Sequence, residues 1–153
     1  MTEKQAELKK QLLKECIRLQ SEQANAAKSA MDEAQESANE HHGAIEDKFE
    51  SFREACQIQR DMYAKQLDEA MTGMSILKRL IATKENSEIM LGSIIETNLQ
   101  TFFIALSLGE IKVDGKPYFA ISAMSPMFKA MAGKKKGDSF AFRDKEFKIK
   151  NIF

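Results

Sequence analysis

Two runs of helix-favouring residues, each about forty residues long, make up the first half of the chain and meet at residues 41–45. Proline is absent from both runs, and Gln, Glu, Ala and Lys dominate them. Each run is long enough for a helix of about 55–60 Å. The short connection favours antiparallel pairing of the two helices within one chain, because closing a short loop costs little entropy. A coiled coil between two chains is the alternative interpretation.

Along the second run, apolar or seam residues recur mostly at alternating steps of four and three, which is the a/d pattern of a coiled coil, and the first run offers a matching stripe. On the second run the predicted seam comprises Ile45, Phe49, Phe52, Cys56, Gln59, Tyr63, Gln66, Ala70, Met74, Leu77 and Ile81. On the first run the matching positions are Leu8, Leu12, Leu19, Ala26, Ala30, Ala34 and Ala38. The first run becomes Ala-rich toward the tip, so we expect Phe49 and Phe52 to pack against small side chains.

The two cysteines, Cys16 and Cys56, lie about 27 and about 13 residues from the tip, which separates them by about 20 Å along an antiparallel pair. That distance is far beyond the reach of a disulfide. We therefore expect two ordinary packed thiols and no redox or catalytic cysteine.

Carboxylates crowd the tip, where eight acidic residues stand against Lys48 and Arg53 and leave a net of six negative charges. These acids are Asp32, Glu33, Glu36, Glu40, Glu46, Asp47, Glu50 and Glu54. The whole chain carries a formal net charge of +0, so the acidity is a local concentration. The alternative interpretation is a solvated, solubilising face. His41 and His42 also lie at the tip, but adjacent helical residues point about 100° apart and make a poor metal-chelating pair, so we expect a solvated turn.

The composition changes near residues 82–87, after which both prolines, most glycines and alternating β-favouring residues follow. We therefore predict a helical hairpin over residues 1–84, with an acidic tip near 40–50, and a second domain over residues 87–153. The two parts carry opposite charge, net minus three for residues 1–86 and net plus three for 87–153. The β-favouring segments of the second part are residues 92–97, 101–107, 111–113, 118–122, 140–142 and 147–152. They predict a small antiparallel sheet, and hence an α+β chain.

One short helix is predicted within this second part. Ser125 stands where an N-cap is wanted, Pro126 suits the first turn, and Gly133 suits the C-cap. A basic turn, Lys134-Lys135-Lys136, follows the glycine.

Membrane insertion and secretion are not expected from this sequence. It contains no run of eighteen apolar residues, and its first residues lack the apolar segment of a signal peptide. We expect a cytoplasmic protein.

The second part contains an ordered set of motifs in residues 120–138. It reads Ala-Ile-Ser-Ala-Met-Ser-Pro at 120–126, then a short helix, then Gly-Lys-Lys-Lys-Gly-Asp at 133–138. This arrangement resembles the C-terminal domain of the bacterial Gre transcript-cleavage factors. The resemblance is close over about 35 residues, and the order of a helical hairpin followed by a sheet domain agrees along the chain. It implies a helical hairpin followed by an FKBP-like sheet domain.

The resemblance also implies a partner, RNA polymerase, and a mode of action. In this family the hairpin enters the secondary channel of the polymerase, and the sheet domain docks beside the mouth of the channel. Nucleic acid is then reached only indirectly, through the elongation complex. The implied polymerase contacts in this chain are Ser125, Pro126, Lys134, Lys135 and Lys136.

Carboxylates at the family's tip help to hold a second Mg²⁺ at the polymerase active site, which activates water to cut backtracked RNA. Asp47 and Glu50 match acidic positions of the family's tip, whereas Ala44 replaces its first aspartate. Asp47 is thus the implied ligand of a shared Mg²⁺, with Glu46 and Glu50 as the other tip candidates. With one carboxylate of the pair missing, we expect weak or absent stimulation of cleavage. We expect no cofactor of the chain's own and no autonomous enzyme activity.

Two functions from other classes are the alternatives. A helical hairpin can serve as an interaction or scaffold module unrelated to transcription. An FKBP-like domain can be a prolyl isomerase, although the short helix at 127–131 offers no evident aromatic-lined proline pocket.

Overall fold

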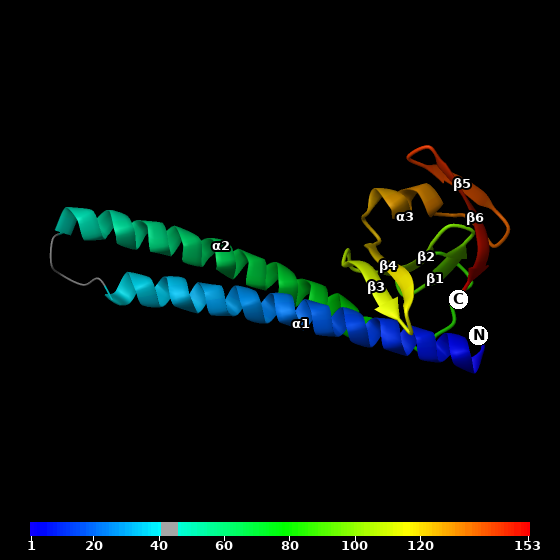
Figure 1. Cartoon of the computed structure of the whole chain (residues 1–153), viewed down its shortest axis with the longest axis horizontal. Helices are drawn as coiled ribbons and strands as arrows, with labels where there is room; N and C mark the ends of the chain where they lie inside the picture. The colour runs from blue at the N-terminus through cyan, green and yellow to red at the C-terminus, as the bar shows by residue number, and fades with distance from the viewer. Residues whose placement is uncertain (41–45) are drawn as a thin grey trace. The chain divides into compact units, whose positions relative to one another are not determined.

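The structure is a computed structural model that describes residues 1–40 and 46–153, with the side chains of residues 46–49 left out (Figure 1). Two long helices come first, and a six-stranded sheet with one short helix follows. The helices are α1 (Glu3–Glu40), α2 (Glu46–Arg79) and α3 (Pro126–Met131). The strands are β1 (Ile94–Thr97), β2 (Thr101–Ala105), β3 (Gly109–Val113), β4 (Lys116–Ser122), β5 (Ser139–Phe142) and β6 (Lys145–Ile152). The predicted α+β class, with a helical hairpin before a sheet domain, is confirmed.

Contacts group the chain into two compact units. The sheet unit comprises residues 1–18 and 76–153, and the hairpin unit comprises residues 19–75. The first turns of α1 and the last turn of α2 therefore belong with the sheet.

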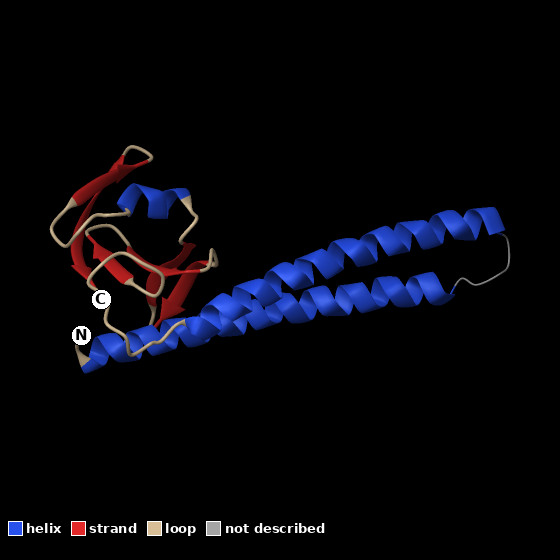
Figure 2. Cartoon of the chain, turned by 180° about the vertical axis from the view of Figure 1, so that it is seen from behind, coloured by secondary structure: helices blue, strands red, loops and turns tan. Residues whose placement is uncertain are grey.

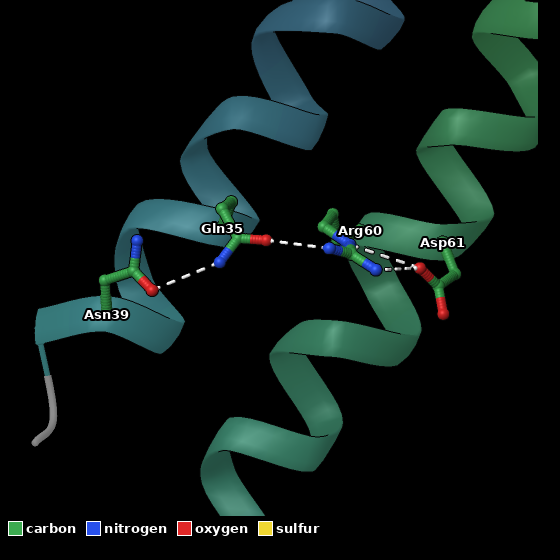
Figure 3. Close-up of polar contacts among 4 residues, drawn as sticks. All are labelled: Gln35, Asn39, Arg60 and Asp61. Carbon is green, nitrogen blue, oxygen red and sulfur yellow. Dashed lines mark hydrogen bonds and ion pairs between the residues drawn. The ribbon is translucent and has the colours of Figure 1, made fainter.

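Hydrogen bonds across the hairpin unit show that α1 and α2 run antiparallel. The amide nitrogen Nε2 of Gln20 donates to the carbonyl oxygen of Ala70 at 2.9 Å. Farther along, Nη1 of Arg60 donates to Oε1 of Gln35 at 3.0 Å (Figure 3). The residue numbers of these pairs, 20 with 70 and then 35 with 60, approach 41–45 from both sides, as expected for a hairpin within one chain.

Part of the predicted seam of α2 is wrong, because some of its positions face solvent. The positions Phe52, Gln59 and Gln66 are exposed, with 42 % of Phe52 accessible to solvent. On α1, Ala27 is buried in place of Ala26, and Ile81 lies beyond the end of α2 and is exposed. The inward-facing positions of α2 include the predicted Cys56, Tyr63, Ala70, Met74 and Leu77, together with three that the pattern did not select, Arg53, Arg60 and Leu67.

The physical reason for this shift lies in the small residues of α1. The buried positions Ala27, Ala34 and Ala38 leave room for long side chains from α2. An arginine can lay its methylene stem along such a surface while its guanidinium forms hydrogen bonds. Arg60 does so by bonding to Gln35 across the seam. A hydrophobicity pattern alone does not identify such a position.

The sheet has the strand order β3-β4-β2-β1-β6-β5. Its strands are drawn in red in Figure 2. The expected antiparallel pairing holds for β1–β2, β1–β6, β3–β4 and β5–β6, whereas β2 and β4 pair in parallel. The strands β3 and β4 form a hairpin through Asp114-Gly115. The parallel pair arises because β4, and not β3, is the strand of this hairpin that lies against β2. Both turn residues have positive φ, 51° and 76°, as the predicted Asp-Gly turn requires.

Aromatic and aliphatic side chains from the strands form the core of the sheet unit. The rings of Phe140 and Phe147 stack with their centroids 5.0 Å apart, and Phe102 meets Phe147 edge-on at 5.9 Å. Met131 of α3 is fully buried against this core. The short helix is therefore fixed on the sheet by its own side chain.

The first turns of α1 are fixed within the sheet unit. A capping box begins the helix: Thr2 Oγ1 accepts from the backbone N–H of Gln5, and Gln5 Oε1 accepts from that of Thr2. Leu12 and Cys16 are fully buried. Both cysteines are free and buried, as expected for packed thiols, and burial raises the pKa of Cys16 to about 12.

Candidate functional site

The loop that leads into α3 is held by three hydrogen bonds from two serines. The backbone N–H of Met124 donates to Ser122 Oγ at 3.1 Å, and that of Ser125 donates to the Ser122 carbonyl at 3.1 Å. Ser125 Oγ then accepts from the N–H of Phe128 at 3.2 Å, which is the predicted N-cap. The half-buried Ser125 hydroxyl thus fixes the loop conformation, whether or not it also contacts a partner.

This ordered loop presents an apolar side chain that the sequence reasoning did not select. Met124 is 85 % exposed, the largest exposure among the large apolar residues described, and Pro126 beside it is also exposed. A methionine between two turn-forming serines was the available sequence signal. An exposed thioether on a fixed loop is well suited to contact an apolar partner surface.

The basic turn lies at the other end of α3 and is equally well defined. The N–H of Lys134 donates to the Met131 carbonyl at 3.1 Å, and that of Lys135 donates to Asp138 Oδ2 at 2.8 Å. The N–H of Asp138 in turn donates to the Lys135 carbonyl at 2.9 Å. All three lysine side chains of the turn are exposed.

The five predicted contact residues therefore flank one short helix. Ser125 and Pro126 lie at its N-terminal end, and Lys134, Lys135 and Lys136 follow its C-terminal end. Six residues of helix span about 9 Å, so both groups can be covered by one partner surface.

The tip predictions fall largely outside the described residues. These include His41, His42 and Ala44, and the side chains of Glu46 and Asp47. Glu50 is described and exposed on α2. Within residues 1–40 and 50–153, no group of three or more His, Cys, Asp or Glu side chains could hold a metal ion. The shared Mg²⁺ at Asp47 stays a prediction.

Close to the tip, the two helices are connected by a short polar network (Figure 3). The guanidinium of Arg60 bonds to Gln35 at 3.0 Å and to Asp61 Oδ1 at 2.7 Å, and Nε2 of Gln35 bonds to Asn39 Oδ1 at 3.1 Å. This network replaces apolar packing where the seam of α1 offers only small residues.

A cleft of about 620 Å³ lies in the sheet unit between the first turns of α1 and the β3–β4 hairpin. Leu8 and Val113 supply apolar lining, and Glu96, Asp114 and Tyr118 supply polar groups. Burial, and then the charges of Glu96 and Asp114, raise the pKa of the Tyr118 phenol. Of the predicted site residues whose side chains the structure describes, none lines this cleft.

No protein-family model matches the chain, and no curated protein matches it. Among solved structures, the chain is similar to a Gre-factor homologue. The structure of the transcription factor Gfh1 is 22 % identical with a TM-score of 0.36, covering 90 % of this chain and 92 % of that one. A crystal structure of GreA factor homolog 1 (Gfh1) of Thermus thermophilus is 22 % identical with a TM-score of 0.33, covering 94 % and 93 %.

Membrane insertion finds no support in the described helices, because none of them combines the length and apolar character that a membrane span requires.

Proposed function

We propose that the chain is a transcription elongation regulator that binds RNA polymerase and inserts its hairpin into the secondary channel. The observation that carries the proposal is the conformation of residues 120–138. In the structure, the motif that resembles the Gre family forms three parts. These are the end of strand β4, a serine-capped helix with a buried methionine, and a lysine turn closed by Asp138. Ser122, Ser125 and Asp138 of the motif thus fix the backbone that presents the exposed side chains.

The hairpin supports the same proposal through its dimensions and its surface. The helices α1 and α2 contain 38 and 34 residues, so each is about 50–57 Å long. The described acids of the distal end are all exposed: Asp32, Glu33, Glu36, Glu40, Glu50 and Glu54. A thin pair of helices with an acidic surface suits insertion into a channel that leads to bound metal ions.

Within this proposal the chain acts on transcription chiefly by occupying the channel. Ala44 replaces one of the two carboxylates that would hold the second Mg²⁺, and one carboxylate holds a hard cation less well than two. Asp47 would supply the remaining ligand, and the metal would serve to activate water. The chain itself would be an accessory factor and not an enzyme.

A binding measurement with the full chain tests the docking surface. We expect Met124→Asp to weaken equilibrium binding to the polymerase core at least about tenfold, because it places a charge on the most exposed apolar side chain of the loop. Leu99→Asp is the matched control, since Leu99 is 53 % exposed in the same unit but lies in the turn between β1 and β2. Equal affinities of both variants and the wild type would refute docking through this loop.

A further inference from the structure

The lysine turn lies directly beside the last strand of the sheet. The N–H of Gly137 donates to the carbonyl of Ile149 at 2.9 Å, and the N–H of Ile149 donates to the carbonyl of Asp138 at 2.9 Å. The pairing of β5 with β6 continues from there, with Ser139 opposite Lys148. The turn is thus held against the middle of β6.

Alternation along β6 places two more lysines on the solvent side at this point. Phe147 and Ile149 are 2 % and 1 % exposed and face the core, whereas Lys148 and Lys150 are exposed. Residues two apart on a strand are about 7 Å apart. We call Lys134, Lys135, Lys136, Lys148 and Lys150 the lysine surface.

Few carboxylates counter this positive charge. Glu146 precedes Lys148 on the same side of β6, and Asp138 uses one carboxylate oxygen to accept from the N–H of Lys135. Within the part of the chain that the structure describes, none of the five ammonium groups takes part in an ion pair. The surface therefore carries a net positive potential on a backbone that hydrogen bonds hold in place.

The composition of the surface indicates the partner. Protein–protein interfaces are depleted in lysine and enriched in arginine and aromatic residues. Here the cations are lysines alone, and the nearby rings of Phe140 and Phe147 are buried and stacked on each other, so they offer no platform for unpaired bases. Lysine binds phosphate as a point charge and reads no base.

We propose that the lysine surface binds the phosphate backbone of duplex nucleic acid without sequence preference. This goes beyond the proposed function, in which nucleic acid is reached only through the elongation complex, and it does not depend on polymerase binding. It assigns Lys134, Lys135 and Lys136, which the resemblance implies as polymerase contacts, to nucleic acid instead. In an elongation complex such a contact would add affinity in a salt-dependent manner.

Fluorescence anisotropy with a labelled 20-base-pair DNA duplex of random sequence tests the proposal on the full chain. We expect binding at 25 mM NaCl that weakens on the order of 100-fold by 100 mM, as for three to four phosphate contacts. The double variant Lys148→Gln/Lys150→Gln should weaken binding at least about tenfold and reduce the salt slope by about two. Its matched control is Lys28→Gln/Lys65→Gln, which removes the same charge from exposed positions of the hairpin unit and should bind within about twofold of the wild type.

Three results would overturn the proposal. The first is the absence of duplex binding by the wild type at 25 mM NaCl. The second is an equal loss of duplex affinity in Lys148→Gln/Lys150→Gln and in its control, which would mean a diffuse charge effect. The third is unchanged duplex binding by Lys148→Gln/Lys150→Gln together with reduced affinity for the polymerase core, which would make the surface a protein-docking site.

Discussion

The ammonium group of Lys9 donates to the backbone carbonyl of Lys84 at 2.8 Å and so connects α1 to the segment that leads into the sheet. The side chain is only 2 % exposed, and its nitrogen lies 6.0 Å from the centre of the Phe153 ring. Burial lowers the pKa of Lys9 to about 8 from an ordinary 10.5, with Glu85 opposing this shift and Lys84 adding to it.

This relationship predicts how stability depends on pH. A lysine whose pKa is lowered in the folded state binds its proton more tightly when unfolded, so folding becomes more favourable as pH rises from about 8 toward 10.5. Relative to Lys9→Met, the wild type should gain about 1–3 kcal/mol of unfolding free energy across this range. Urea unfolding at several pH values measures the difference. Unfolding free energies of the wild type and Lys9→Met that change in parallel with pH would contradict the account.

The buried amide of Gln20 predicts a second stability effect. It is 6 % exposed and provides a hydrogen bond from α1 to the backbone of α2. Gln20→Ala should lower the unfolding free energy by about 1 kcal/mol through loss of this bond and its packing. The exposed Gln23→Ala is the control and should change stability by less than about 0.5 kcal/mol. Similar values for both variants would show that the polar seam contributes nothing to helix pairing.

Ser125 allows a structural role to be separated from a contact role. Ser125→Ala removes the cap on Phe128 and should cost about 0.5–2 kcal/mol, whereas Ser125→Asp keeps an acceptor and should retain most of the stability. Thermal unfolding of both variants measures the cap. If the hydroxyl also contacts polymerase, Ser125→Asp will bind it more weakly despite being folded. Normal binding by Ser125→Asp would restrict Ser125 to capping.

Much of this architecture could be predicted from the sequence because its local signals agree. The capping residues Ser125 and Pro126 and the turn Asp114-Gly115 all form as their chemistry requires. The parallel pairing of β4 with β2 could not be predicted, because local alternation does not specify which strand of a hairpin lies inside. The exposure of Phe52 was missed because the seam follows hydrogen-bonding residues such as Arg60.

The two parts of the candidate surface in the sheet unit were predictable to different degrees. Ser125 and the lysine turn carry backbone-directing residues, so the sequence indicates both their identity and their geometry. Lys148 and Lys150 became part of the same surface only through the pairing of Gly137 with Ile149, which joins positions twelve apart in sequence. Such juxtapositions depend on register, which composition does not reveal.

The tip sequence predicts a gain of function. Ala44→Asp restores the acidic residue of the resembling family, so it should raise the rate of RNA cleavage in stalled, backtracked elongation complexes at least about tenfold over a weak or absent wild-type level. Adding Asp47→Asn should abolish the gain while leaving polymerase binding nearly intact. Cleavage by the double variant equal to that of Ala44→Asp would remove Asp47 from the metal-holding role.

Insertion of the hairpin into the channel is tested most directly by site-specific photocrosslinking in the assembled complex. A photoreactive residue at Glu50, which is exposed on α2 near the tip, should crosslink to polymerase residues inside the secondary channel. The same group at Lys129 on α3 should crosslink at the mouth of the channel. Crosslinks from Glu50 only to a second copy of the chain, or to the outer surface of a polymerase that has bound the protein, would contradict insertion.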